Sequence, residues 1–301
     1  MSLLVTGSIG IDTVSTPHGR ADGVLGGTAV YFSFAATPYV PVRLVGAVGD
    51  DFPAEFRDVL ESRGIDLAGL EVRPNSKTFR WTGRFEGAMN EAETLDVQLN
   101  VLAEHAPKVP ASFADSDLVF LANTHPTLQR ELLSQLSSPG LVVCDSMNLW
   151  IQNERESLLQ TLRRVTGVII NDGEARQLTE CVNLIEAGER VLEMGPRFVM
   201  IKKGEHGSLL ITSDGAFALP AFPSKKVRDP TGAGDSFAGG VMGYLAEHGR
   251  HDTDALRRAM VRGTIAASFT IEDFSLGRVR ELGRSEINQR VDWFLGMLRC
   301  E

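Results

Sequence analysis

The sequence predicts an α/β fold, a three-layer sandwich in which helices cover both faces of a mostly parallel central sheet. Two observations support this prediction. Short apolar runs alternate with helical patterns over most of the 301 residues, and most positions within these runs are apolar, not only every second one. Continuous apolar strands are typical of sheets that are covered on both faces. The alternation of strands with helices favours parallel connections.

The predicted strands are short, and several end directly at a polar residue or a glycine. They cover residues 3–6, 42–48, 118–121, 141–144, 168–170, 198–201 and 209–212. Helices are predicted between them at residues 53–63, 126–136, 154–164 and 184–194. Further helices are predicted after Gly234, at residues 235–247, 253–269 and 285–298. No repeat or low-complexity linker interrupts this order, so we expect residues 1–301 to form a single domain.

Residues 77–98 follow a different pattern, in which Phe79, Trp81 and Phe85 stand at alternate positions among polar residues. A period of two predicts a hairpin with one covered face. We expect a small antiparallel β lid, formed by segments at about residues 13–25 and 76–100, over the strand ends where open α/β sheets bind ligands. An ordinary solvent-facing hairpin remains an alternative, and an uncovered face with Phe79 and Trp81 could also build a homodimer.

The composition excludes several classes of protein. With 43% hydrophobic residues and a net charge of −9, the chain is neither generally disordered nor suited to a nucleic-acid partner. Cys144, Cys181 and Cys300 are far apart and form no C-x-x-C pair, so a disulfide framework is not expected. The first residues lack the pattern of a signal peptide, and no apolar run reaches the ~18 residues that span a bilayer. We therefore expect a cytoplasmic protein without a membrane partner.

The strongest motif is Asp-Pro-Thr-Gly-Ala-Gly-Asp at residues 229–235, followed at once by an apolar helical pattern. Glycines let several backbone N–H groups point to one place, and a helix N-terminus adds free N–H groups and a positive dipole end. Such a site binds an anion, which the Asp235 carboxylate alone would repel. The conflict is resolved if Asp235 takes a proton from a hydroxyl while the backbone stabilises a transferring phosphoryl group. The alternative is a simple turn with Asp235 as helix cap.

With this motif the chain resembles the PfkB family of carbohydrate and nucleoside kinases, which has the ribokinase-like fold. Four more segments match family patterns in the same order, at residues 26–29, 45–51, 171–174 and 202–207. The resemblance implies transfer of the γ-phosphoryl group of ATP to a hydroxyl, with Asp235 as catalytic base. It assigns the anion hole to the backbone N–H groups of Gly232, Ala233 and Gly234. Activation by a monovalent cation such as K⁺ occurs in related enzymes.

The resemblance also implies which residues bind the nucleotide and magnesium. Asn171 and Glu174 match the Asn-x-x-Glu pattern that organises Mg²⁺, its waters and the ATP phosphates, with Glu174 reaching the metal through water. A carboxylate and waters suit a hard cation. The same two residues are also a typical helix-capping pair, and both interpretations can hold together. Lys202 and Gly204 are expected to contact the phosphates and ribose of the nucleotide.

On the acceptor side, the resemblance implies that Asp12 binds hydroxyls of the substrate beside the glycine pair Gly26 and Gly27. Ribokinase-type members carry asparagine where this chain has Tyr31, which removes an amide and adds an aromatic face. We expect a sugar or sugar-like polyol as acceptor, with a nucleoside such as adenosine as the alternative. A non-catalytic ligand sensor on the same fold is the alternative of another class, but it would not need Asp235.

Three further features are weaker hypotheses. Arg84 of the lid is a candidate for holding a phosphate on the substrate, and the Asp145–Asn148 pair is a candidate for shaping the acceptor site. The small residues of helix 262–269 would let a flat adenine approach, although they would equally permit close helix packing. The Walker pattern is absent from the sequence, which argues against a P-loop kinase.

Overall fold

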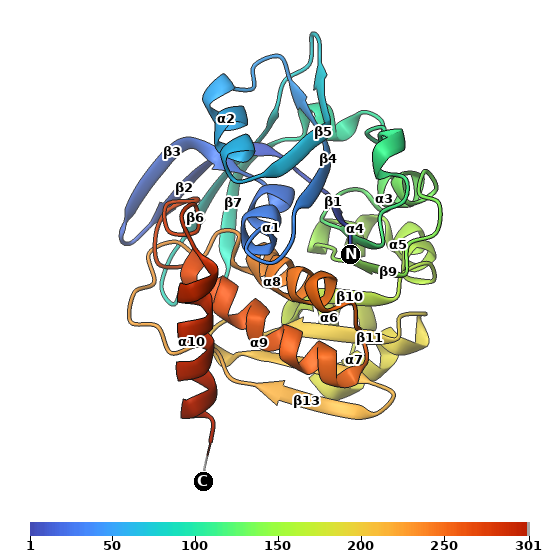
Figure 1. The fold of residues 1–301 in the computed structure, drawn as a ribbon, viewed down its shortest axis with the longest axis vertical. Helices are drawn as coiled ribbons and strands as arrows, with labels where there is room; N and C mark the ends of the chain where they lie inside the picture. Colours follow the sequence, from blue (N-terminus) through green and yellow to red (C-terminus); the bar gives the residue numbers. More distant parts are fainter. Residues whose placement is uncertain (300–301) are drawn as a thin grey trace.

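The computed structural model describes residues 1–299 and contains one large sheet with helices on both faces (Figure 1). Its strands are β1 (Leu3–Thr6), β4 (Val42–Gly49), β5 (Ile65–Arg73), β8 (Leu118–Leu121), β9 (Leu141–Cys144), β10 (Gly167–Asn171), β11 (Phe198–Lys202), β12 (Ser208–Thr212) and β13 (Gly215–Leu219). They lie in the order β13-β12-β11-β10-β9-β8-β1-β4-β5. All neighbouring pairs from β11 to β5 are parallel, whereas β12 and β13 are antiparallel. The mostly parallel sheet predicted from the sequence is confirmed.

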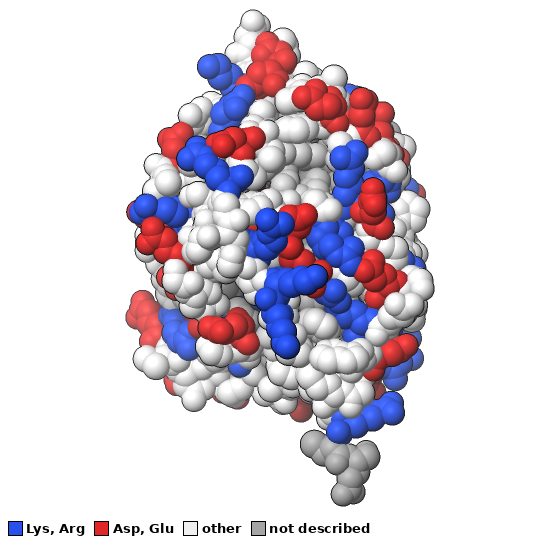
Figure 2. Space-filling model, turned by 90° about the vertical axis from the view of Figure 1, so that its left-hand side faces the viewer, with Lys and Arg blue, Asp and Glu red and all other residues white. Residues whose placement is uncertain are grey.

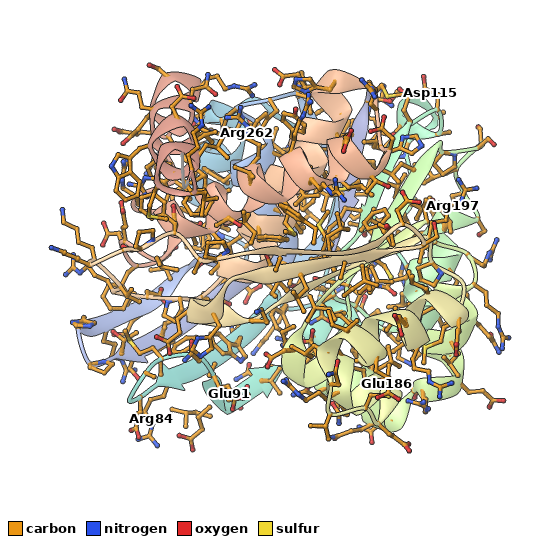
Figure 3. The ribbon with its side chains drawn as sticks, turned by 90° about the horizontal axis from the view of Figure 1, so that it is seen from below. Arg84, Glu91, Asp115, Glu186, Arg197 and Arg262 are labelled. Carbon is orange, nitrogen blue, oxygen red and sulfur yellow. The ribbon has the colours of Figure 1, made fainter. Side chains whose placement is uncertain are left out.

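The helices form two layers. One layer contains α1 (Thr28–Ala36), α2 (Ala54–Ser62), α8 (Ala233–His248), α9 (Thr253–Thr270) and α10 (Arg284–Met297), and the other contains α3 (Pro126–Leu133), α4 (Asn148–Asn153), α5 (Arg155–Leu162), α6 (Asp172–Thr179) and α7 (Leu184–Glu193). Successive strand residues reach opposite layers, since Leu3 and Val5 belong to one core and Leu4 to the other. Strands between two cores are apolar at most positions for this reason. Figure 3 shows the sheet edge-on between the layers.

The sequence patterns did not predict the strands β5 and β13 or the short helix α4. Both strands lie at the edges of the large sheet, where one side has no neighbouring strand. The first residues of β5 alternate between buried and exposed, so this strand lacks the continuous apolar run of the central strands. The helix α4 has only six residues, which is too short to show a helical period.

The lid is a second sheet with the order β3-β2-β6-β7 (Figure 1, upper left). It consists of β2 (Gly10–Thr16), β3 (Gly19–Gly26), β6 (Phe79–Phe85) and β7 (Ala92–Gln98). Each hairpin is antiparallel, as predicted, but β2 and β6 pair in parallel and join the two hairpins. Figure 2 shows this side of the molecule, where basic and acidic side chains are interspersed.

Cys144 is buried and Cys181 is partly exposed, and neither forms a disulfide among the described residues, while Cys300 lies outside them. Within residues 1–299, none of the helices combines the length and the apolar character that crossing a bilayer requires.

Candidate active site

The candidate site lies at the carboxyl edge of the large sheet, where the parallel strands end. Asp145 directly follows β9, and Asn171 and Lys202 are the last residues of β10 and β11. The register of β10 and β11 places Asn171 beside Lys202. Because parallel strands end at the same edge of a sheet, side chains that are far apart in sequence come together there. Asp235 reaches the same place from the first turn of α8.

The start of α8 has the open backbone geometry that an anion site requires. Gly232 is the N-cap residue with φ of +73°, and no side chain caps the helix. The backbone N–H groups of Gly232 and Gly234 make no hydrogen bond with any described residue. The N–H of Ala233, in contrast, donates to the carbonyl of Pro230 at 3.1 Å and closes the turn. Of the three N–H groups predicted for the anion hole, two are free in this conformation, and the role of all three stays a prediction.

The ring of Tyr31 packs against this turn. A Cβ atom built on Gly232 would overlap the Tyr31 ring, so the backbone rests directly on the aromatic face. Tyr31 is only 1% exposed, and its hydroxyl has no hydrogen-bond partner among residues 1–299. The tyrosine that replaces the family's asparagine therefore lies under the predicted phosphate loop as well as beside the acceptor residues.

We expect Gly232→Ala to destabilise the protein more than Gly249→Ala, the matched change at the other end of α8. Both glycines have positive φ, +73° and +65°, so alanine costs about 1–2 kcal/mol at each. At Gly249 the nearest atom to the new Cβ is 3.6 Å away, whereas at Gly232 the Cβ meets the Tyr31 ring. Overpacking there adds about 1–3 kcal/mol. Urea unfolding of both variants measures the difference, and equal losses of stability would contradict the contact with Tyr31.

Lys202 brings positive charge to this loop. Its Nζ atom lies 2.8 Å from the position that a Cβ on Gly234 would occupy. Burial raises the pKa values of Asp235, Glu174 and Asp145, and the Lys202 ammonium opposes the rise in all three carboxyl groups. Asp145 also feels the charges of Asp235 and Glu174. One ammonium group therefore interacts electrostatically with three carboxyl groups, and such an arrangement can organise phosphate groups and a hard cation.

Asn171 and Glu174 form the capping box that the sequence offered as an alternative. The Glu174 N–H donates to Asn171 Oδ1 and the Asn171 N–H donates to Glu174 Oε2, both at 2.7 Å. Glu174 is only 8% exposed, and burial raises the pKa of its carboxyl group. The capping interpretation is confirmed. It leaves the predicted magnesium role open, because the carboxylate still neighbours Lys202 and Asp235.

The acceptor side centres on Asp12, which comes from β2 of the lid. The Asp12 carboxylate is 4% exposed, and its Oδ1 atom has no partner among the described residues. Burial raises the pKa of Asp12 to about 7, the Gly27 N–H opposes this rise, and the charge of Asp235 adds to it. A Cβ on Gly26 would overlap the Asp12 carboxylate. The glycine pair therefore packs directly on Asp12, as the prediction of an acceptor site requires.

Gly204 lies where the lid meets the loop after β11. This glycine has φ of +53°, and a Cβ on it would be 2.7 Å from Asn90 Oδ1. The Asn90 side chain donates to Glu205 Oε1 at 2.9 Å. The tip of the β6–β7 hairpin thus touches the loop that is predicted to bind the nucleotide, so the lid spans both halves of the site.

Of the weaker hypotheses, the structure contradicts the one that concerns Arg84. Arg84 forms ion pairs with Glu93 at 2.6 Å and Glu86 at 3.2 Å, and Figure 3 shows it at the outer edge of the lid, so it does not face the site. Asp145 is buried, and Asp235, Lys202 and Glu174 are the charged groups that act on it, so its role in shaping the acceptor site stays a prediction.

The small residues of α9 pack against α8 rather than line an open space. A Cβ on Gly240 would lie 2.8 Å from the Arg262 carbonyl oxygen, and a Cβ on Gly263 would lie 2.7 Å from the Phe237 carbonyl oxygen. The two helices therefore touch through their glycines. Of the two explanations that the sequence left open for this segment, close helix packing is confirmed at these positions.

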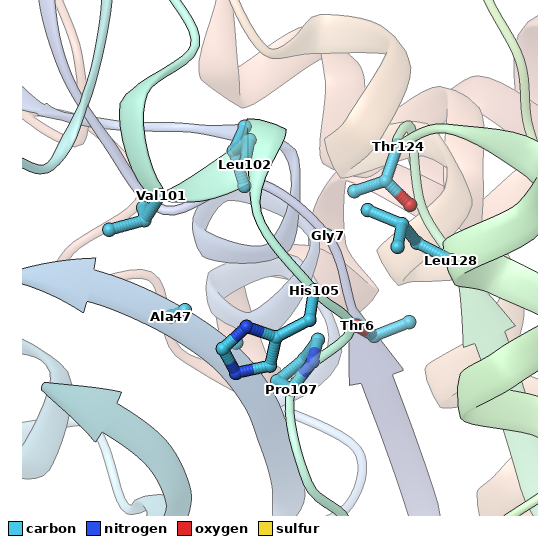
Figure 4. Close-up of a pocket in the computed structure, with 10 residues that line it drawn as sticks. Thr6, Gly7, Ala47, Val101, Leu102, His105, Pro107, Thr124 and Leu128 are labelled. Carbon is cyan, nitrogen blue, oxygen red and sulfur yellow. The ribbon is translucent and has the colours of Figure 1, made fainter. Parts of the chain in front are cut away.

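A pocket beside the site is lined by none of the carboxylates described above and not by Lys202. Figure 4 shows it at the carboxyl ends of β1 and β4, against the segment 101–107 and the start of α3. Its lining consists of Thr6, Gly7, Gly46, Ala47, Val101, Leu102, His105, Pro107, Thr124 and Leu128. Without a carboxylate or a lysine, this pocket adds apolar surface near the acceptor side but no group for phosphate chemistry.

Comparisons with known proteins agree with this geometry. The family model for the pfkB family carbohydrate kinase matches residues 26–277. A cytidine kinase of Thermococcus kodakarensis is 30% identical over 274 residues, which cover 87% of this chain and 94% of that protein.

Among solved structures, a Burkholderia thailandensis nucleoside kinase in complex with inosine has a TM-score of 0.81 at 21% identity, covering 98% of this chain and 99% of that one. A putative ribokinase II from E. coli in complex with ATP and Mg²⁺ has a TM-score of 0.78 at 17% identity, covering 97% and 99%. At these identities the structures establish the fold, which is ribokinase-like as predicted.

Proposed function

The chain belongs to the pfkB family of carbohydrate kinases, phosphotransferases with an alcohol group as acceptor, and we propose that it transfers the γ-phosphoryl group of ATP to a hydroxyl of a nucleoside. One observation carries this proposal. The Asp235 carboxylate stands at the uncapped start of α8, where it interacts electrostatically with Asp12 and with Lys202. A base between an acceptor carboxylate and a phosphate-binding lysine is the arrangement that phosphoryl transfer needs.

In this mechanism, the Asp12 carboxylate accepts hydrogen bonds from two hydroxyls of the acceptor and orients them. Asp235 then accepts the proton of the reacting hydroxyl. The oxygen forms a bond to the γ-phosphorus of ATP, and the bond to the bridging oxygen of ADP breaks. The free N–H groups of Gly232 and Gly234, with the predicted help of Ala233, stabilise the negative charge on the transferring group.

Kinases of this family use ATP with Mg²⁺, and the residues of this site fit such a pair. The unpartnered Oδ1 atom of Asp145 and the carboxylate of Glu174 are oxygen donors of the kind that magnesium prefers. Residues 1–299 contain no group of three metal-ligating side chains. This suits an ion that keeps several waters and is held partly by nucleotide phosphates. Bound Mg²⁺ would supply charge neutralisation on those phosphates, while Lys202 contacts them directly. Activation by K⁺ stays a prediction.

The relatives support a nucleoside ahead of a free sugar, which reverses the order that the sequence suggested. The cytidine kinase of T. kodakarensis covers most of this chain at 30% identity, and the B. thailandensis structure holds inosine. A free sugar or polyol remains the second candidate, because Asp12 recognises hydroxyls that both classes carry.

A substrate screen tests the proposal. Release of ADP is measured with ATP, Mg²⁺ and single acceptors, namely the common ribonucleosides, D-ribose and a set of hexoses. We expect a ribonucleoside to have a kcat/KM at least ~100-fold above that of every free sugar, because a base adds contacts that a sugar lacks. Turnover of sugars without nucleosides would overturn the choice of acceptor, and release of ADP at the same rate without any acceptor would overturn the kinase mechanism.

A further inference from the structure

Three aromatic residues of the lid face the same way as Asp12. The parallel register of β2 and β6 pairs Gly10 with Phe79, Asp12 with Trp81 and Val14 with Gly83. Residues that pair across neighbouring strands project from the same face of a sheet. Phe79, Trp81 and Phe85 stand at alternate positions of β6, so all three share the face of Asp12. Phe79 and Trp81 thus lie on the face of the lid that carries the acceptor carboxylate, and this face is only partly covered.

Two glycines leave room for the first two rings to pack against the lid backbone. A Cβ on Gly10 would be 2.6 Å from Phe79 Cδ1, and a Cβ on Gly83 would overlap the six-membered ring of Trp81. The Trp81 Nε1–H donates to Thr94 Oγ1 at 3.2 Å, which fixes the orientation of the indole. Because both rings pack against glycines and the indole is also held by Thr94, the lid offers a preformed aromatic surface at low entropic cost.

This surface remains partly open although it is apolar. Phe79 and Trp81 are both partly exposed. Val97, which pairs with Trp81 across the β6–β7 hairpin, is 49% exposed. The opposite face of β6 is polar instead, since Arg80 pairs with Asp51 at 2.8 Å and Arg84 pairs with Glu93 at 2.6 Å. Apolar groups are thus concentrated on the one face that also carries Asp12.

We propose that Phe79, Trp81 and Val97, called the lid platform below, bind the nucleobase of the acceptor by stacking, with Trp81 as the main contact. This inference rests on the proposed function, because it requires a nucleoside acceptor whose ribose is held by Asp12. Trp81 pairs with Asp12 in the strand register, so the base and the ribose of one nucleoside can reach adjacent residues of the same sheet. Stacking is tolerant of base identity, since every base has a flat π-face.

The test compares Trp81→Leu with Trp81→Phe and with Thr82→Val, a control on the opposite face of β6. Loss of stacking should raise the KM for the nucleoside about 10- to 100-fold in Trp81→Leu, while Trp81→Phe stays within about threefold of the native enzyme. The KM for ATP should not change. Any turnover of D-ribose, which has no base, should also be unaffected in Trp81→Leu.

Tryptophan fluorescence gives a readout that does not depend on turnover. The chain has three tryptophans, and Trp293 lies exposed on α10. A nucleoside added without ATP should quench the emission of the native protein and of Trp293→Phe, but not that of Trp81→Phe.

The outcomes separate this inference from the proposed function. If the native enzyme phosphorylates sugars but no nucleoside, the proposed nucleoside kinase activity is wrong, and the inference about the lid platform is then wrong as well. If it uses nucleosides while Trp81→Leu behaves like Thr82→Val, the inference alone fails. Loss of a dimer in Trp81→Leu, seen by light scattering without a change in KM, would instead show that the platform binds a second copy of the chain.

Discussion

Asp235→Asn should lower kcat by about 100- to 10,000-fold, the usual contribution of a positioned general base. The amide keeps the size of the side chain but cannot accept the proton of the acceptor hydroxyl. Binding of ATP should be retained, because Lys202 and the free N–H groups of Gly232 and Gly234 are untouched. Coupled measurement of ADP release gives kcat, and calorimetric titration gives the affinity for ATP.

The pH profile provides a second readout for Asp235. Burial raises the pKa of this carboxyl group, so the native enzyme should lose activity as the pH falls through that raised pKa. The residual activity of Asp235→Asn should not show this loss at low pH. Asp254→Asn is the matched control, because Asp254 is the acidic residue in the first turn of α9 and is exposed. If Asp235→Asn retained full turnover, the assignment of Asp235 as the catalytic base would be wrong.

Asp12→Asn should stabilise the protein while it weakens catalysis. The pKa of Asp12 is about 7, against an ordinary value of 3.8. As the pH rises from about 4 to about 7, the unfolded chain gives up its proton before the folded chain does, so the native state loses stability over this range. About three pKa units correspond to about 4 kcal/mol, which sets the upper bound of the effect. The amide of the variant carries no charge and escapes this loss.

Urea unfolding at about pH 4, 6 and 8 measures whether Asp12→Asn is more or less stable than the native protein, because these pH values bracket the change in proton binding. The variant should match the native protein at the lowest pH and exceed its stability increasingly at the two higher values. Asp58→Asn, at an exposed position of α2, should follow the native protein at every pH. The kcat/KM for the acceptor should fall about 100-fold in Asp12→Asn, because bonds to a charged acceptor are worth about 1.5–3 kcal/mol each. Equal stability at the highest pH would contradict the burial of a charged Asp12.

The central strands could be predicted because burial on both faces produces a continuous apolar run in the sequence. Leu3, Leu4 and Val5 are all apolar since they alternate between two cores, and the strand over residues 3–6 is found where it was expected. The edge strand β5 has no continuous apolar run, because in its first residues only every second side chain is buried. The same limit applies to α4, whose six residues span fewer than two turns.

The order of motifs along the chain was sufficient to predict the fold and the kinase class. Five short patterns in one order determine which strand carries which polar residue, and a parallel sheet brings these residues to one edge. The distances within that edge depend on the loops and on strand register. The neighbours of Asp145 show this, because its sequence context indicates a strand end but not whether it faces the acceptor or the phosphates.

The ribokinase-like fold, the family and the candidate residues Asp235, Asp12 and Lys202 could all be predicted from the order of motifs in the sequence. The direction in which the lid faces could not be predicted, because the alternation of Phe79 and Trp81 defines a face but does not show which residues that face contacts. The parallel pairing of β2 with β6, two segments that are distant in sequence, places those rings on the side of Asp12. Local patterns record burial, whereas the pairing of distant strands is set by the packing of the whole chain.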